Sequence, residues 1–244
     1  MRIVTYNIKN GGRPSRVDAV RRVMRSLEPD VLALQELRGG PLSISGWRAY
    51  AARSWFGQPV AVYVRAGLDV LAAGPVRRPF HHAASRVVVA TAAGPLTVVS
   101  AHLHPHRPPA RRREARRLAA AVRGRPLAVV CGDLNGLDPW SDHADEVARL
   151  APPYRLRHLR PDGSVDTRAV ASLAAAGLVD IGDGSGPTAP TALGGAEFSD
   201  MRLDYVFGTP AVAARARSYR VVRGGEAETA SDHYPVLVDL DLSD

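Results

Sequence analysis

Short runs of apolar, β-branched residues recur along the whole chain and predict a protein rich in strands. Several of these runs are apolar at consecutive positions, which is typical of strands that are covered on both faces. The clearest runs are Ile3–Ile8, Val31–Gln35, Val60–Val64, Arg86–Ala90, Leu96–Ala101, Leu127–Cys131, Leu203–Phe207 and Val236–Leu240.

Three segments between these runs have the periodicity of amphipathic helices. The first follows Ser15 and Asp18, which together resemble a capping box, and it ends before Pro29. The second covers residues 110–122, with small and aliphatic residues on one face and arginines largely on the other. The third covers residues 167–176, just before a glycine.

Composition places the chain among ordinary globular proteins. Of its 244 residues, 45% are hydrophobic and 23% are charged, which excludes a disordered tail, a collagen repeat and a disulfide miniprotein. Because the helices are too few to alternate strictly with strands, we expect one α/β domain over residues 1–244, with two packed sheets and helices outside. The only cysteine, Cys131, cannot form an internal disulfide, so nothing requires an oxidising compartment.

The chain is strongly basic, with a formal net charge of +8, and arginine supplies all but one of its basic side chains. This charge suits a polyanionic substrate, although an excess of arginine also follows from GC-rich coding. Eight arginines lie between residues 107 and 125. They could follow a nucleic-acid backbone or form a solvated helix face, and no aromatic residue among them favours base stacking.

The first residues, Arg2–Ile8, read as a strand, without a charged leader or a cleavage site. No apolar run approaches the ~20 residues that a membrane helix needs. We therefore expect a cytoplasmic protein that has no membrane partner and is a monomer.

Polar side chains that suit metal binding and proton transfer collect at the ends of the predicted strands. In α/β proteins, strand ends direct such side chains into a shared cleft. Each of them alone is better explained by a turn or a solvated loop, whereas the whole set favours a catalytic site. The set is Asn7, Glu36, His102, Asp133, Asn135, Asp204, Asp232 and His233.

Six short motifs in this order resemble the endonuclease/exonuclease/phosphatase superfamily, the deoxyribonuclease-I-like group. The resemblance spans residue 4 to about residue 240. It implies a four-layer α/β/β/α sandwich with two mixed sheets and helices outside, and an attack of water on a phosphate ester that depends on Mg²⁺ or Mn²⁺. The motifs are Thr5-Tyr6-Asn7-Ile8, Leu34-Gln35-Glu36-Leu37-Arg38, Ser100-Ala101-His102-Leu103, Gly132-Asp133-Leu134-Asn135, Arg202-Leu203-Asp204-Tyr205-Val206-Phe207 and Ser231-Asp232-His233-Tyr234-Pro235-Val236.

The resemblance also implies which residues bind the metal and the water. Glu36 matches the main metal carboxylate, with Asn7 beside it, and Asp232 matches a further metal or water ligand. Asp133 and Asn135 match the pair that orients the attacking water and holds a phosphate oxygen. Oxygen ligands of this kind are those that Mg²⁺ prefers.

The two histidines have different implied roles. His233 matches the general base or electrostatic partner of the water, and Asp204 would fix its tautomer. His102 matches a second histidine that steadies the phosphate or protonates the leaving oxygen. The sequence does not identify an acidic partner for His102.

Two arginines are candidate substrate-binding residues, since guanidinium groups bind phosphate oxygens in a bidentate manner. Arg38 lies two residues after Glu36 and matches a phosphate-contacting arginine. Arg86 either matches a second such arginine or stands there by chance.

Other features leave alternatives open. His102, His104 and His106 alternate and could share a zinc ion, but Pro105 interrupts the strand that this arrangement needs. His81, His82, Asp142 and His143 are expected in surface loops. The segment Gly136–Asp166 either shapes the substrate pocket or contributes Trp140 and Tyr154 to the core.

The leading hypothesis is a metal-dependent phosphodiester hydrolase, a nuclease that acts as an endonuclease on DNA or RNA. The alternative is a phosphatase or phosphodiesterase for a small molecule, a nucleotide or a lipid headgroup. A non-catalytic binding module on the same fold is a third hypothesis, and the unbroken motifs argue against it.

Overall fold

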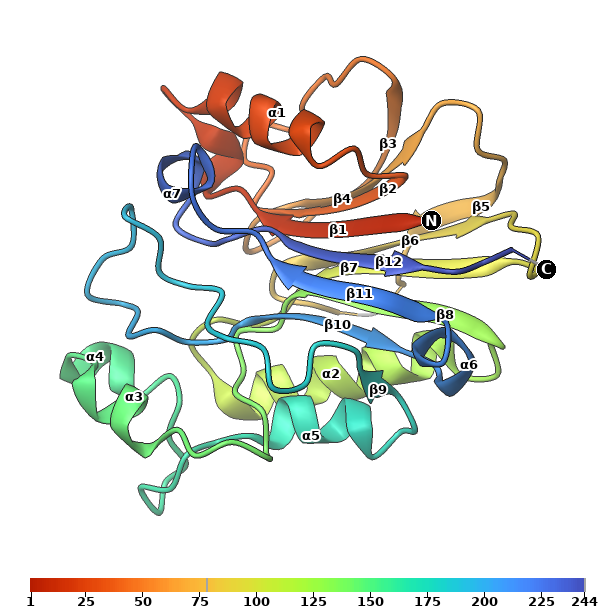
Figure 1. Cartoon of the computed structure of the whole chain (residues 1–244). Coiled ribbons are helices and arrows are strands. Elements are labelled where there is room, and N and C mark those ends of the chain that lie inside the picture. The colour runs from red at the N-terminus through yellow and green to blue at the C-terminus, as the bar shows by residue number, and fades with distance from the viewer. Residues whose placement is uncertain (78, 244) are drawn as a thin grey trace.

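Two six-stranded sheets packed face to face form the centre of the molecule (Figure 1). The computed structural model describes residues 1–77 and 79–243. The first sheet contains, in spatial order, β11 (Ala216–Val221), β12 (Val236–Leu240), β1 (Arg2–Asn7), β2 (Val31–Gln35), β4 (Val60–Arg65) and β3 (Trp47–Ala52). The second contains β5 (Val70–Pro75), β6 (Ala83–Val89), β7 (Leu96–His102), β8 (Leu127–Asp133), β10 (Asp204–Gly208) and β9 (Val179–Asp180).

Helices cover the outer faces of both sheets. Helix α1 (Val17–Ser26) packs on the first sheet, while α2 (Pro108–Val122) and α5 (Arg168–Ala174) pack on the second (Figure 1). This is the expected four-layer sandwich. Within the described residues, no helix has the length and apolar character that crossing a bilayer requires. The short helices are η1 (Asn10–Gly12), α3 (Ala144–Arg149), α4 (Pro152–Arg155), α6 (Pro210–Ala213) and α7 (Ala227–Ala230).

All eight predicted strands are present, with ends displaced by three residues at most. The strands that the apolar pattern missed are β3, β5, β9 and β11, which are the four edge strands of the two sheets. Edge strands are covered less than central ones, and exposed or half-buried positions dominate β5 and β11. Apolar runs therefore revealed only the strands that are buried on both faces.

The three predicted helices are also confirmed, with two local corrections. Helix α1 begins after Arg16 without a side-chain cap, so the capping box expected at Ser15 is wrong. Helix α2 buries the expected small and aliphatic face, but it also buries Arg111, which is 1% exposed. The Arg111 guanidinium donates to the carbonyl oxygens of His104 and Pro105, so this arginine holds the start of the helix.

The space between the sheets is aliphatic along most of its length and becomes polar near one end. There Gln35 Nε2 donates to Thr5 Oγ1 at 3.1 Å and to Ser100 Oγ at 3.1 Å. Ser100 Oγ in turn donates to the carbonyl oxygen of Leu34 at 3.2 Å. Because these buried groups satisfy one another, they join the two sheets at little cost in desolvation.

Strand register directs the predicted catalytic residues to this polar end. In the parallel pair β7 and β8, His102 lies opposite Asp133, and in the antiparallel pair β8 and β10, Asp133 lies opposite Asp204. Asn7 closes β1 in the first sheet. This end lies opposite the two chain termini (Figure 1).

Gly132 allows β7 and β8 to approach closely just before Asp133. Its φ angle is +137°, and a Cβ atom placed on it would lie 1.9 Å from the carbonyl oxygen of Ala101. Only glycine fits this position without moving the strand that carries His102.

We therefore expect Gly132→Ala to lower the free energy of unfolding by about 3 kcal/mol or more, since steric overlap adds to backbone strain. Denaturant unfolding followed by circular dichroism measures this change. Gly163→Ala is the matched control, because Gly163 has a φ angle of +80° with no atom within 4 Å of the added Cβ. Equal destabilisation by the two substitutions would contradict the steric argument.

Candidate active site

Asn7, Glu36, His102, Asp133, Asp204, Asp232 and His233 gather at the polar end of the two sheets and are called the catalytic cluster below. The carboxylate of Asp133 lies at its centre. Its Oδ2 accepts a hydrogen bond from Asn7 Nδ2 at 3.0 Å and lies 3.3 Å from His102 Nε2 and 3.9 Å from His233 Nε2. Its Oδ1 accepts from the backbone N–H of Asn135 at 2.8 Å. Burial raises the pKa of Asp133, but the two histidines outweigh it and lower the pKa below its ordinary value. Asp133 is therefore a negative charge held between the two sheets.

His233 and Asp204 form a buried pair on one side of Asp133. His233 Nδ1 lies 2.7 Å from Asp204 Oδ2, which also accepts a hydrogen bond from Thr188 Oγ1 at 2.7 Å. Burial lowers the pKa of His233, but the charge and hydrogen bond of Asp204 outweigh it and raise the pKa to about 10. His233 is therefore an imidazolium at neutral pH, with Nε2 facing Asp133.

His102 lies on the other side of Asp133, and the structure reveals the acidic partner of His102 that the sequence did not identify. Its acidic neighbour is Asp133 itself, which lies beside it on the adjacent strand. Burial lowers the pKa of His102, but Asp133 more than compensates, so the pKa is raised.

Glu36 lies at the mouth of the cluster, immediately after β2. Its φ angle of 62° turns the chain so that the carboxylate faces β1. Oε2 accepts hydrogen bonds from the backbone N–H of Asn10 at 3.0 Å and from Gln58 Nε2 at 2.9 Å, while Oε1 lies 3.3 Å from Asn7 Nδ2. Asn7 therefore bridges the carboxylates of Glu36 and Asp133.

Asp232 pairs with Lys9, the only lysine in the sequence. Lys9 Nζ lies 2.8 Å from Asp232 Oδ2. The ammonium group thus neutralises one of the predicted metal or water ligands.

The chemistry of this donor set fits a divalent cation. The four carboxylates of Glu36, Asp133, Asp204 and Asp232 outnumber the three basic side chains of Lys9, His102 and His233 that lie among them. Asp204 Oδ1 is buried without a hydrogen-bond partner. Within the described residues, Asp133, Asp204 and His233 place candidate ligand atoms within 4.8 Å of one another, but His233 has no lone pair for a metal while it is an imidazolium. Oxygen ligands with excess negative charge are what Mg²⁺ and Mn²⁺ require.

The ring of His82 lies directly against that of His102. The two imidazoles are stacked with centroids 3.8 Å apart and an angle of 5° between their planes. Gln58 donates its backbone N–H to His82 Nδ1 at 2.7 Å, and burial lowers the pKa of His82 to about 2. The expectation of a surface-loop residue is wrong here, because a neutral, buried His82 supports one face of His102.

The other histidines do not form the zinc cluster considered from the sequence. His104 stacks on His81 with centroids 4.3 Å apart, and its Nδ1 accepts the backbone N–H of His106. The imidazoles of His102 and His104 thus have different partners. His143 is buried as well, with Nε2 3.0 Å from the carbonyl oxygen of Asp138, which corrects the surface-loop expectation for this residue, whereas Asp142 is exposed as expected.

The two predicted substrate-binding arginines lie in different places. Arg38 is exposed, two residues beyond Glu36 at the mouth of the cluster. Arg86 does not join the cluster. Its neighbour Ser85 points between the sheets, where it donates to the Tyr50 carbonyl oxygen, so Arg86 points to the opposite face, into a hollow that Ala121 of α2 also lines.

Several residues that contact the cluster were missed in the sequence. Gln58 and Thr188 come from loops whose composition carries no catalytic signal, and Lys9 follows the first motif without belonging to it. Of the two aromatic residues in Gly136–Asp166, Tyr154 packs on a small core of aliphatic residues, whereas Trp140 is 41% exposed.

Structural comparison finds the same fold in proteins of low sequence identity. An endonuclease/exonuclease/phosphatase from Bacteroides vulgatus is 19% identical with a TM-score of 0.71, covering 99% of this chain and 98% of that chain. A 3′ phosphatase from Neisseria bound to a product DNA hairpin is 20% identical with a TM-score of 0.70, covering 99% of each chain. A mannosyl-6-phosphatase from Bacteroides thetaiotaomicron is 16% identical with a TM-score of 0.68, again covering 99% of each chain.

Sequence comparison assigns the family. No curated protein matches the chain. The profile of the Endonuclease/Exonuclease/phosphatase family matches residues 4–233, which is nearly the whole chain and contains the entire cluster around Asp133. The chain therefore belongs to the endonuclease/exonuclease/phosphatase family, whose members hydrolyse phosphoester bonds.

Proposed function

We propose that this protein is a divalent-metal-dependent phosphodiester hydrolase that acts as a nuclease. The observation that carries the proposal is the arrangement around Asp133 Oδ2, which has Asn7 from one sheet and His102 and His233 on its other sides. Phosphate-ester hydrolysis needs a proton acceptor for water and positive charge for the phosphate oxygens. This cluster supplies both within one buried site.

Glu36, Asn7 and Asp232 would hold the metal ion. A bound Mg²⁺ or Mn²⁺ would neutralise charge on the phosphate and on the leaving oxygen. Asn7 contacts Glu36, and Lys9 forms an ion pair with Asp232. A phosphate that binds here would therefore lie near the ammonium group of Lys9 as well as near the carboxylates of Glu36 and Asp232.

Asp133 is the group that takes the proton of the attacking water. It is ionised; its Oδ1 accepts the backbone N–H of Asn135, and its Oδ2 faces the donors of Asn7, His102 and His233, so the attacking water would enter among these groups. The Asn135 side-chain amide donates to the carbonyl oxygen of Leu103, so its position beside the water is fixed.

The two histidines act as donors. His233, whose pKa the Asp204 carboxylate raises, would stabilise the negative charge that develops on the phosphate. His102 lies on the other side of Asp133, in position to bind a phosphate oxygen or to protonate the leaving oxygen.

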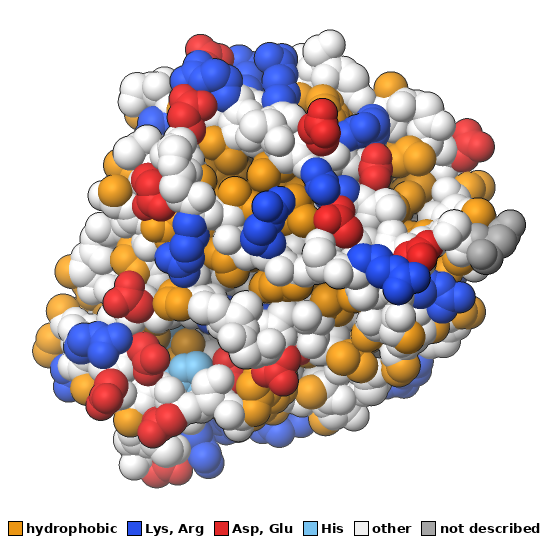
Figure 2. All heavy atoms as spheres, in the orientation of Figure 1, with side chains coloured by type: hydrophobic (Ala, Val, Ile, Leu, Met, Phe, Trp, Pro, Cys, Tyr) orange, Lys and Arg blue, Asp and Glu red, His pale blue; other side chains and the backbone are white. Residues whose placement is uncertain are grey.

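The formal net charge of +8 supports nucleic acid as the substrate. On the face in Figure 2, however, arginine side chains lie among acidic ones. Several arginines of the molecule are paired with carboxylates, as Arg22 is with Glu226 and Arg217 with Asp241. The positive charge that would attract a nucleic-acid strand is therefore not spread evenly over the molecule.

We expect metal-dependent nicking of supercoiled plasmid that stops in EDTA and weakens as salt rises, since phosphate contacts release counterions. Glu36→Ala and His233→Ala should each reduce the nicking rate by about 100- to 1,000-fold, as loss of one electrostatic group in an active site does. Gel assays of nicking over Mg²⁺, Mn²⁺ and NaCl series measure these effects.

Glu226→Ala is the matched control, because Glu226 is an exposed glutamate that pairs with Arg22 away from the cluster. Full turnover by both site variants would refute the mechanism. Metal-dependent cleavage of bis-(p-nitrophenyl) phosphate without nicking would instead indicate a small phosphoester as substrate, the alternative function. If calorimetry shows no Mg²⁺ or Mn²⁺ binding, a binding module on this fold becomes the better description.

The pKa of His233 gives an independent test of the Asp204 contact. Asp204→Asn removes the negative partner but keeps the burial, so the pKa of His233 should fall from about 10 to below 6.5. Because folding raises this pKa, charged His233 stabilises the fold fully below about pH 6.5 and loses that effect as pH rises toward 10. Histidine NMR titration in EDTA measures the pKa directly.

Asp241→Asn is the control, since that carboxylate binds Arg217 at the surface and should leave the His233 titration unchanged. If the pKa of His233 stayed near 10 in the Asp204→Asn variant, a group other than Asp204 would be the one that raises it.

A further inference from the structure

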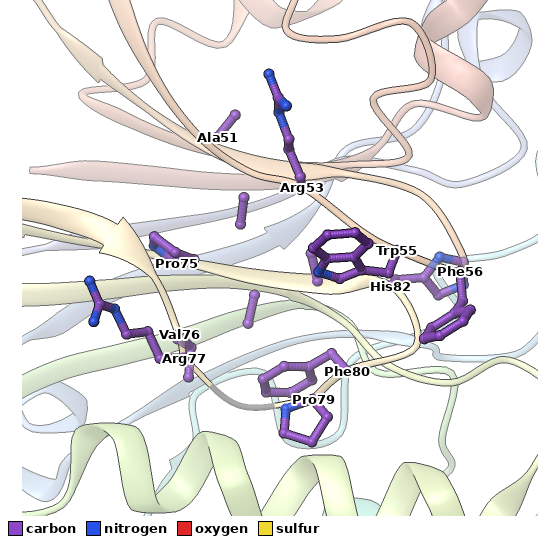
Figure 3. Close-up of a pocket in the computed structure, with 13 residues that line it drawn as sticks. Ala51, Arg53, Trp55, Phe56, Pro75, Val76, Arg77, Pro79, Phe80 and His82 are labelled. Atoms are coloured by element: carbon purple, nitrogen blue, oxygen red, sulfur yellow. The ribbon is translucent and has the colours of Figure 1, made fainter.

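A pocket of about 730 Å³ lies beside the catalytic cluster, between the β3–β4 loop and the segment that joins β5 to β6 (Figure 3). Its volume falls within the range of about 300–1,000 Å³ that is typical of small-ligand sites. None of the predicted catalytic residues lines it.

Aromatic side chains dominate this pocket. Trp55 and Phe56 on the β3–β4 loop are 92% and 82% exposed, and Phe80 projects into the same space from the other segment (Figure 3). Exposed large apolar groups that gather at one place mark a binding surface. Flat rings in this arrangement suit another flat ring, and every nucleobase has one.

The charge of the pocket suits an anionic ligand. Arg53 and Arg77 line it, and among its described lining residues there is no carboxylate. This differs from the face in Figure 2, where acidic side chains lie between the arginines. Guanidinium groups bind phosphate oxygens well, so aromatic rings together with two arginines match a base joined to a phosphate backbone.

His82 connects the pocket to the catalytic cluster. It lines the pocket, and its ring stacks on His102 with 3.8 Å between centroids. Ala83 also lines the pocket and lies opposite His102 in the strand register. His82 is therefore a residue that both lines the pocket and contacts the catalytic histidine.

We propose that this pocket is a subsite that stacks an unpaired nucleobase of the strand whose phosphate is hydrolysed beside His102. The inference rests on the proposed nuclease function and narrows its substrate to single-stranded segments or frayed ends. Trp55 and Phe80 hold the base, and Arg53 and Arg77 hold the neighbouring phosphates.

The test is binding of a fluorescein-labelled single-stranded oligonucleotide in EDTA, followed by fluorescence anisotropy. Abasic residues replace the bases one position at a time, which keeps the phosphate charge. For the wild type, one or two of these replacements should weaken binding by about 5- to 150-fold, the usual contribution of one stacked base. The Trp55→Ala variant should bind the normal strand more weakly by the same factor, and its affinity should no longer change when a base is removed. The Trp55→Phe variant should retain most of the affinity.

Leu156→Ala is the control, because Leu156 is 69% exposed and does not line the pocket. Phe80→Ala tests the opposite wall. If the wild type binds normal and abasic strands equally, or binds neither, the subsite is overturned. Binding to phosphatidylserine vesicles that Trp55→Ala abolishes, without any dependence on bases, would also overturn it and would assign the pocket to a lipid surface.

Failure of the nuclease function is separable from failure of the subsite. Base-dependent binding through Trp55 without nicking of any strand would refute the proposed activity and leave the subsite standing. Nicking by the wild type, together with binding by Trp55→Ala that still depends on the bases as in the wild type, would refute the subsite and leave the proposed activity standing.

Discussion

The Oδ2 atom of Asp133 joins the two halves of the site. Asn7 reaches it from the first sheet, His102 lies beside it in the second, and His233 faces it from the segment before β12. A buried carboxylate is strongly unfavourable unless donors and positive charge surround it. The packing of the two sheets at this end and the charge state of the site are therefore linked, since neither arrangement is favourable without the other.

The backbone at this end is conformationally costly, and the cost is local. Glu36 and Asn135 have positive φ angles of 62° and 49°, and Gly132 has one of 137°, which glycine adopts without the Cβ penalty. Such angles are unfavourable for residues with a Cβ and occur mainly where surrounding structure imposes them. Here the buried hydrogen bond between Gln35 and Ser100 joins the two sheets close to the strand ends and holds them in place. This arrangement of the strand ends is present without a substrate.

Much of the fold and the candidate site could be predicted from apolar runs and motif order, because central strands are buried on both faces and their ends carry the polar side chains. The partner of His102 could not, because it depends on the register of β7 and β8, which the sequence does not specify. The orientation of Arg86 depends on the face of β6, and the burial of His82 depends on stacking between separate elements. Contacts between loops, such as that of Gln58 with Glu36, carry no local pattern at all.

The pairing of Lys9 with Asp232 has a consequence for chemical labelling. Apart from the α-amino group, Lys9 Nζ is the only amine in the sequence, and its side chain is 30% exposed. An amine-directed reagent that leaves arginine untouched therefore has one side-chain target, located within the catalytic cluster. A fluorophore or crosslinker attached there would report on the site itself without any engineered cysteine, and the α-amino group is the one other amine that has to be kept unlabelled.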